Sequence, residues 1–84
     1  MSDSNHISGR QIAAARALAG IAQADLAASA SISVPTLRRM EASEGTASGL
    51  PNNVAAVRRA LESAGVIFVD ENGEGPGVRL RKSS

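Results

Sequence analysis

Residues 22–41 read AQADLAASASISVPTLRRME, and this stretch decides the fold because it describes two short helices joined by a tight turn. Two helices that cross through a turn of about three or four residues need a small side chain where their backbones nearly touch, and Ala27 supplies it. The turn needs an apolar residue on its inner side, which is Ile32. Ser33 caps the second helix and Leu37 anchors it to the core. The pattern predicts a helix-turn-helix unit whose second helix lies on the outside.

The segments on either side of this unit predict one helix before it and one after it. Ser8 and Gln11 fit a capping box that starts a helix over about residues 9–19, and Gly20 is well placed to end it. The inward face of this helix is predicted to consist of Ile12, Ala15, Leu18 and Ala19. Pro51 opens the later helix, in which apolar residues recur at helical spacing.

After Gly65 the pattern changes from helical to strand-like. Val66–Val69 is a continuous apolar run, residues 70–77 are rich in glycine, and residues 78–81 alternate between apolar and basic. We therefore expect a C-terminal β-hairpin over residues 66–82. Its first strand is apolar on both faces, so one face can cover the helices and the other needs a partner. The candidate contacts with a second subunit are Val66, Ile67, Phe68, Val69, Val78 and Leu80.

Size and composition restrict the classes of protein that this chain can belong to. The 84 residues suffice for one domain, and sixteen of them are alanines, which suits short helices packed closely together. The absence of cysteine and the single histidine argue against a disulfide framework and a zinc site. No apolar run approaches the roughly 20 residues of a membrane span, and the polar N-terminus does not resemble a signal peptide. We expect a cytoplasmic protein with residues 1–6 disordered and the helical domain over residues 7–65.

The charged residues give no sign of catalysis. The formal net charge is only +1, with acidic residues gathered in the loop over residues 70–74 and basic residues in pairs such as Arg38–Arg39. There is no set of nucleophile, base and orienting group, so we expect no catalytic residues, no cofactor and no metal. The glycines of the loop do not open a helix after a strand, and turn geometry accounts for them better than phosphate binding.

The residues of the motif resemble the Cro/C1 (Xre-type) family of helix-turn-helix regulators of bacteria and phages. The resemblance covers about residues 8–65 and rests on Gln23, Leu26, Ala27, Ile32, Ser33, Thr36, Leu37, Arg39 and Glu41. It implies a mainly α, lambda-repressor-like domain of four to five helices, followed here by the β-hairpin. It also implies a buried ion pair between Arg16 and Glu41. The closing segment, residues 60–80, is similar to the tail of many short bacterial regulators of this type.

Three positions depart from the family's pattern. Ala22 stands where the family prefers a Ser or Thr cap, so the helix over about residues 23–30 begins without a side-chain cap. Ser31 replaces the usual turn glycine, which predicts a serine at positive φ with about 1 kcal/mol of strain. Val34 and Pro35 occupy positions that often read bases, and each can contact a thymine methyl group. Hydrogen-bonded readout is then left to Gln23, Arg38 and Arg39.

The motif and the resemblance together imply a sequence-specific transcriptional regulator, by default a repressor, that binds a palindromic operator in double-stranded DNA as a homodimer. The helix over about residues 34–42 would enter the major groove, with its copies about 34 Å apart in successive grooves. The candidate DNA contacts are Gln23, Ser33, Val34, Pro35, Thr36, Arg38 and Arg39. Because the chain has no small-molecule ligand domain, control would come from its concentration, promoter geometry or a regulatory protein partner.

An interaction module on the same fold, antitoxin-like or anti-activator, is the alternative reading of the sequence. Three features favour it: the low net charge, the apolar pair Val34–Pro35 at the outer edge of the motif, and the apolar hairpin. An antitoxin would combine both activities, because it binds DNA as well as a protein partner.

Overall fold

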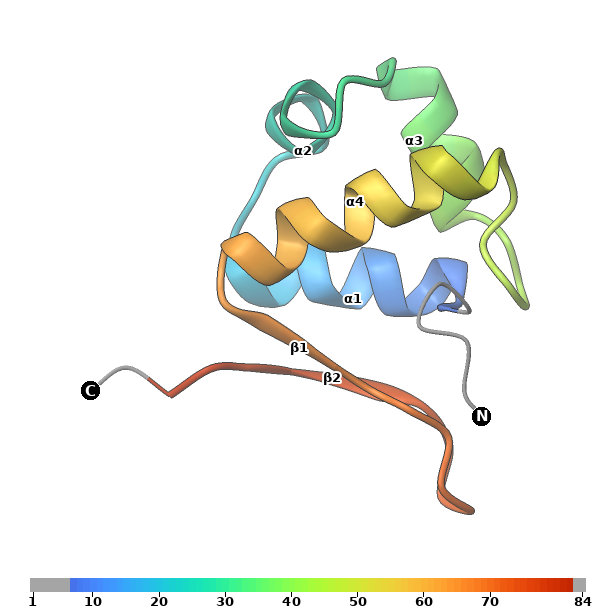
Figure 1. The fold of residues 1–84 in the computed structure, drawn as a ribbon, viewed down its shortest axis with the longest axis vertical. Helices are drawn as coiled ribbons and strands as arrows, with labels where there is room; N and C mark the ends of the chain where they lie inside the picture. The colour runs from blue at the N-terminus through green and yellow to red at the C-terminus, as the bar shows by residue number, and fades with distance from the viewer. Residues whose placement is uncertain (1–6, 83–84) are drawn as a thin grey trace.

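Four helices and a two-stranded antiparallel hairpin make up the computed structural model, which describes residues 7–82 (Figure 1). The helices and strands are α1 (Gly9–Ala19), α2 (Gln23–Ser29), α3 (Val34–Glu41), α4 (Pro51–Ser63), β1 (Val66–Val69) and β2 (Gly77–Leu80). The prediction of a mainly α chain that closes with a β-hairpin is confirmed. The disorder predicted for residues 1–6 lies outside the described residues.

Local capping interactions explain where α1 begins and ends and where α3 begins. Ser8 Oγ accepts a hydrogen bond from Gln11 N at 3.0 Å, and Ser8 N donates to Gln11 Oε1 at 2.8 Å, which completes the predicted capping box. Gly20 ends α1 in the left-handed conformation, with φ 71°. Ser33 Oγ caps α3 by accepting from Thr36 N at 3.2 Å. As expected from Ala22, α2 begins without a side-chain cap.

The turn between α2 and α3 has the geometry expected from its residues. Ser31 has φ 58°, the positive value that the missing turn glycine predicts. The chain is held there by backbone bonds from Ser31 N to Ala28 O at 3.1 Å and from Ile32 N to Ala27 O at 3.0 Å. Ile32 is half-buried and packs against the core, so it covers the inner side of the turn.

The hairpin register shifts the second strand by one residue from the predicted 78–81. Val69 pairs with Gly77 and Val66 pairs with Leu80, so β2 begins at Gly77. Arg81 follows the strand and remains attached through its backbone N–H, which donates to Gly65 O at 2.6 Å. The difference arises because pairing starts directly after the turn, before the alternation of apolar and basic residues begins.

The apolar core collects residues from all four helices, from β1 and from the segment before α1. Its largest fully buried side chains are Ile7, Ile12, Leu26, Leu37, Met40, Leu61, Val57 and Val66. Leu18, which the sequence places on the inward face of α1, is instead 46% exposed. It lies about 120° around the helix from Ile12, beyond the edge of the buried stripe. Within residues 7–82, no helix combines the length and apolar character needed to cross a membrane.

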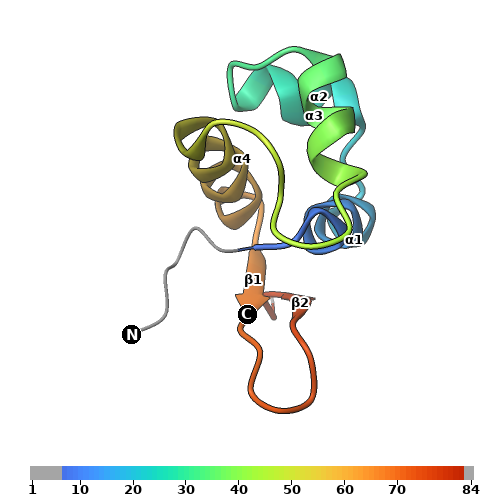
Figure 2. The ribbon, with the colours of Figure 1, turned by 90° about the vertical axis from the view of Figure 1, so that its right-hand side faces the viewer.

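The elements form three layers that put the hairpin and α3 on opposite sides of the molecule. In Figures 1 and 2, α2 and α3 lie on one side, α1 and α4 lie in the middle, and the hairpin lies beneath α1 and α4. One face of the hairpin therefore covers the helices. The outer surface of α3 stays free of contact with the hairpin.

The side chain of Gln11 joins α1 to the hairpin. It is 8% exposed, and its Nε2 donates to Gly77 O at 3.1 Å and to Val69 O at 3.4 Å. Loss of these bonds leaves two partly buried carbonyl groups without this donor, which costs about 1–2 kcal/mol. We expect Gln11→Ala to lower the free energy of unfolding in urea by that amount, and Arg10→Ala, on the exposed side of the same turn, to change it little. Equal effects of the two substitutions would contradict this role for Gln11.

Candidate nucleic-acid interface

The outer face of α3 carries two arginines side by side along the helix. Pro35, Arg38, Arg39 and Ala42 are exposed and follow the i, i+3, i+4, i+7 spacing of a single helix face. Leu37 and Met40 face the other way and are completely buried. The buried pair holds the helix on the core, and the exposed residues form a basic surface that we call the α3 face.

A small hydroxyl cluster lies at the beginning of the α3 face. Ser33 Oγ and Thr36 Oγ1 are 2.8 Å apart, and Arg39 Nη2 donates to Thr36 Oγ1 at 3.4 Å. Val34 is half-buried and packs against the core, whereas Pro35 is exposed. The contact of Val34 with DNA stays a prediction.

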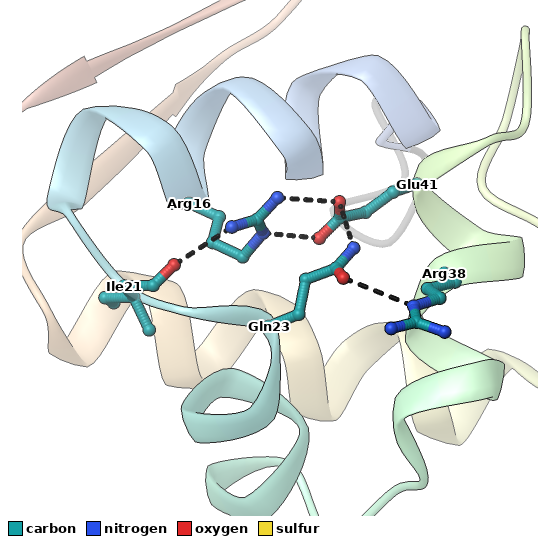
Figure 3. Close-up of polar contacts among 5 residues, drawn as sticks. All are labelled: Arg16, Ile21, Gln23, Arg38 and Glu41. Carbon is teal, nitrogen blue, oxygen red and sulfur yellow. Dashed lines mark hydrogen bonds and ion pairs between the residues drawn. The ribbon is translucent and has the colours of Figure 1, made fainter.

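An ion pair ties α1 to the C-terminal end of α3 (Figure 3). Arg16 Nε donates to Glu41 Oε2 at 2.8 Å and Arg16 Nη2 donates to Glu41 Oε1 at 3.2 Å, a two-bond arrangement of guanidinium and carboxylate. Arg16 Nη1 also donates to Ile21 O at 3.1 Å. The side chain of Glu41 is only 8% exposed and that of Arg16 is 24% exposed. The two residues form the pair that the sequence resemblance implies.

Gln23, the first residue of α2, extends this network to the α3 face. Its Nε2 donates to Glu41 Oε1 at 3.0 Å, and its Oε1 accepts from Arg38 Nε at 3.4 Å (Figure 3). Sequence reasoning assigns Gln23 a direct contact with DNA, whereas here its amide links α2 to α3. One N–H of that amide remains available to an external acceptor. The geometry gives Gln23 a positioning role that sequence reasoning missed.

The two arginines of the α3 face, Arg38 and Arg39, have no carboxylate partner in the part of the chain that the structure describes. Arg58 of α4 differs, since its Nε is 3.1 Å from Glu62 Oε2 and its guanidinium lies 5.0 Å from the centroid of the Phe68 ring. Arg58 is thus engaged at the hairpin, on the side of the molecule away from the α3 face.

Two serines of the loop after α3 also support the α3 face, and the sequence analysis did not single them out. Ser43 Oγ donates to Arg39 O at 3.1 Å and Ser48 Oγ donates to the same oxygen at 3.3 Å. The carbonyl groups of the last turn of a helix lack partners within the helix, so hydroxyl groups nearby satisfy them. A serine directly after a helix is the sequence signal, although many loop serines do not act in this way.

The hairpin residues predicted to contact a second subunit divide between two environments. Val66 is 1% exposed and Phe68 is 8% exposed, because both face the helices of their own chain. These two are therefore corrected from subunit contacts to core residues. Val69 and Val78 are half-buried, and only Ile67, 38% exposed, and Leu80, 46% exposed, present substantial apolar surface.

No protein-family model matches this chain, and no curated protein matches it either. The functional conclusion consequently depends on the α3 face and on the residues that hold it in place.

Proposed function

We propose that this protein is a helix-turn-helix regulator of transcription that binds specific DNA sequences through α3. The observation that carries the proposal is the α3 face, where Arg38 and Arg39 project from a helix whose opposite side is completely buried. An exposed helix of this kind fits the major groove of B-DNA, which is about 12 Å wide. Arginine is the side chain that most often reads guanine there, through two parallel hydrogen bonds.

The contacts of the α3 face support different roles for its residues, some contacting bases and others contacting phosphate groups. Arg38 and Arg39 would supply base readout, and Pro35 would contact a thymine methyl group. The hydroxyl groups of Ser33 and Thr36 lie at the N-terminal end of α3, where donors to DNA phosphate are favoured. Contacts to phosphate position the helix but carry no sequence information, so specificity would depend mainly on the two arginines.

The network behind α3 favours specificity because it limits the freedom of Arg38. The Gln23 amide holds the Arg38 guanidinium, and Glu41, paired with Arg16, holds the Gln23 amide. A side chain that is already oriented loses less conformational entropy when it binds. We therefore assign Gln23 as a positioning residue for Arg38, with a phosphate contact through its second amide N–H.

We propose a homodimer on a palindromic operator as the binding form, as the resemblance to Cro/C1 regulators over residues 8–65 implies. Two copies of α3 would occupy successive major grooves about 34 Å apart. Repression through occupancy of the operator is the simplest regulatory outcome for such a protein.

A binding experiment with substitutions on the α3 face tests the proposal. Preferred DNA sequences would be selected from a random library by the full chain, and affinity measured by fluorescence anisotropy at two salt concentrations. We expect Arg38→Ala and Arg39→Ala each to weaken binding to the selected sequence by about tenfold to a hundredfold, corresponding to about 1–3 kcal/mol per lost base contact. Arg59→Ala, which removes an exposed arginine from α4, should change affinity little.

Two results would contradict DNA recognition by α3. One is the recovery of no preferred sequence from the library. The other is equal loss of affinity for selected and random DNA in the Arg38 and Arg39 variants, which would indicate phosphate contact without readout.

The protein-interaction alternative has one structural observation in its favour. Leu50, immediately before α4, is 68% exposed and would offer a large apolar side chain to a protein partner. If Leu50→Ser abolished a function that Arg38→Ala left intact, the partner of this chain would be a protein rather than DNA.

A further inference from the structure

A groove lies beside the hairpin turn, on a part of the molecule that the proposed DNA contacts do not use. Its volume is about 590 Å³, and it is bounded by the first half of α1, the loop after α3 and the hairpin turn. Its apolar lining includes Ile7, Ala14 and Val78, and its acidic lining consists of Glu44, Asp70 and Glu71. The combination of apolar and acidic lining suits an extended segment that carries both apolar and basic side chains.

The charge of this groove is predominantly negative. Three carboxylates line it against one basic side chain, Arg10. One carboxylate oxygen of Glu71 is already hydrogen-bonded within the turn, because its Oε2 accepts from Gly73 N at 2.8 Å and from Gly75 N at 3.0 Å. Glu44 and Asp70 are exposed, and neither forms an ion pair with another residue in the range 7–82. Their charges are available to a basic ligand.

A segment with complementary chemistry exists on this same chain. Arg79, Leu80, Arg81 and Lys82 are all exposed and form the end of β2 and the residues after it, which we call the basic tail. It provides three cationic side chains and one large apolar side chain, Leu80, which is 46% exposed. The basic tail therefore matches the acidic and apolar lining of the groove.

Arg81 and Lys82, the last two residues of the basic tail, lie away from the groove of their own chain. Leu80 is paired with Val66, and Arg81 N donates to Gly65 O at 2.6 Å, so the tail is fixed at the open end of the hairpin. The groove is at the other end, beside the turn, and Figure 1 shows the two ends on opposite sides of the fold. Val78 lines the groove and Arg81 lies three residues further along the chain, roughly 10 Å away at about 3.3 Å per residue. A second copy of the chain can make the contact.

We infer that two copies associate by placing the basic tail of each in the acidic groove of the other. A two-fold axis makes the exchange reciprocal, so that both tails and both grooves are occupied in a closed dimer. The outer face of the hairpin is a weaker candidate, because Ile67 is its only large, substantially exposed apolar residue, whereas stable interfaces bury about 800 Å² per partner. The two available carboxylates of each groove, Glu44 and Asp70, would face the cations of the partner's tail and form the charge network that isolated surface ion pairs lack.

This inference specifies the subunit interface of the proposed homodimer, and its test uses no DNA. Sedimentation velocity of the full chain would be compared with that of two charge-reversed variants. The tail variant is Arg81→Glu with Lys82→Glu, and the groove variant is Glu44→Lys with Asp70→Lys. These substitutions avoid Glu71, which the turn needs, and the matched control is Arg59→Glu on the exposed face of α4.

We expect the natural chain and the Arg59→Glu control to dimerise, more weakly as salt is raised, and each reversed variant to lose at least tenfold in association constant. An equimolar mixture of the two variants should recover dimers, because each tail then meets a groove of opposite charge. Native mass spectrometry would identify these as heterodimers by mass. Combining all four substitutions in one chain should restore the homodimer.

Several results would overturn the inference. These are a monomeric natural chain at hundreds of micromolar, reversed variants that dimerise as well as the natural chain, or a mixture that associates no better than its components. Growth beyond a dimer would overturn the closed two-fold arrangement. If the protein is a monomer and still binds selected DNA, only the inferred interface is contradicted. If it is a dimer without DNA selectivity, only the proposed function is contradicted.

Discussion

Replacing Glu41 by alanine is expected to lower the free energy of unfolding by about 2–4 kcal/mol. The substitution leaves the Arg16 guanidinium without its carboxylate and removes the acceptor of the Gln23 amide. Removing one partner from a buried ion pair costs about 3–5 kcal/mol, and we expect a smaller value here because the Arg16 side chain is 24% exposed and keeps its bond to Ile21 O. A small domain has only about 5 kcal/mol of stability or somewhat more, so part of the population would unfold.

The second ion pair of the described residues provides a matched control. Arg58 and Glu62 are one turn apart on α4, and Glu62 is 41% exposed. Pairs of this kind contribute about 0.3–0.5 kcal/mol, so Glu62→Ala should have an effect near that size. Both variants would be measured by urea denaturation with circular dichroism. Equal losses of stability in Glu41→Ala and Glu62→Ala would show that Glu41 is no more than a surface charge. The loss of stability in Glu41→Gln should lie between those of the two alanine variants, because the amide oxygen still accepts from Arg16.

The helix ends could be predicted from the sequence because each is determined by a few neighbouring residues. A serine before α1 or α3 satisfies backbone N–H groups that the helix itself cannot, and Gly20 adopts a conformation that other residues avoid. These capping signals act within three or four residues, so no knowledge of the tertiary structure is needed. The positive φ of Ser31 was expected instead from the resemblance, because the family usually has a glycine at this position of the turn.

The placement of the hairpin could not be predicted in the same way. Gln11 bonds to Gly77, 66 residues later in the chain, and nothing in the local sequence of either indicates the contact. The burial of Phe68 likewise depends on which hairpin face meets the helices. Both faces of β1 are apolar, so periodicity alone could not choose between them.

The candidate DNA contacts were only partly accessible to sequence reasoning. Arg38 and Arg39 were singled out because a basic pair on the outer helix is a local pattern, and both lie on the α3 face. The side-chain link from Gln23 to Arg38 and the packing of Val34 against the core required the angle between α2 and α3. Their contacts with DNA stay predictions, since they depend on a partner as well as on the fold.

Replacing Gly9 by alanine should destabilise the protein by about 2–3 kcal/mol, although alanine is normally the better residue in a helix. A Cβ at this position would collide with the carbonyl oxygen of Met40 and would lie 2.6 Å from that of Ser43. Both are backbone atoms, so the conflict cannot be relieved by rotating a side chain. Gly9 N also donates to Gly45 O at 3.1 Å, which fixes the approach of α1 to the loop after α3.

Gly45→Ala provides the matched control for this substitution. A Cβ at Gly45 would meet no atom within 4 Å, and its φ is not in the positive region. Alanine there should leave stability unchanged or raise it by about 0.4–1 kcal/mol, by restricting the unfolded chain. The midpoints of thermal and urea unfolding should therefore fall for Gly9→Ala and stay unchanged or rise for Gly45→Ala. If Gly9→Ala were as stable as Gly45→Ala, the close contact between α1 and the end of α3 would not exist, and the orientation of the α3 face relative to α1 would have to be different.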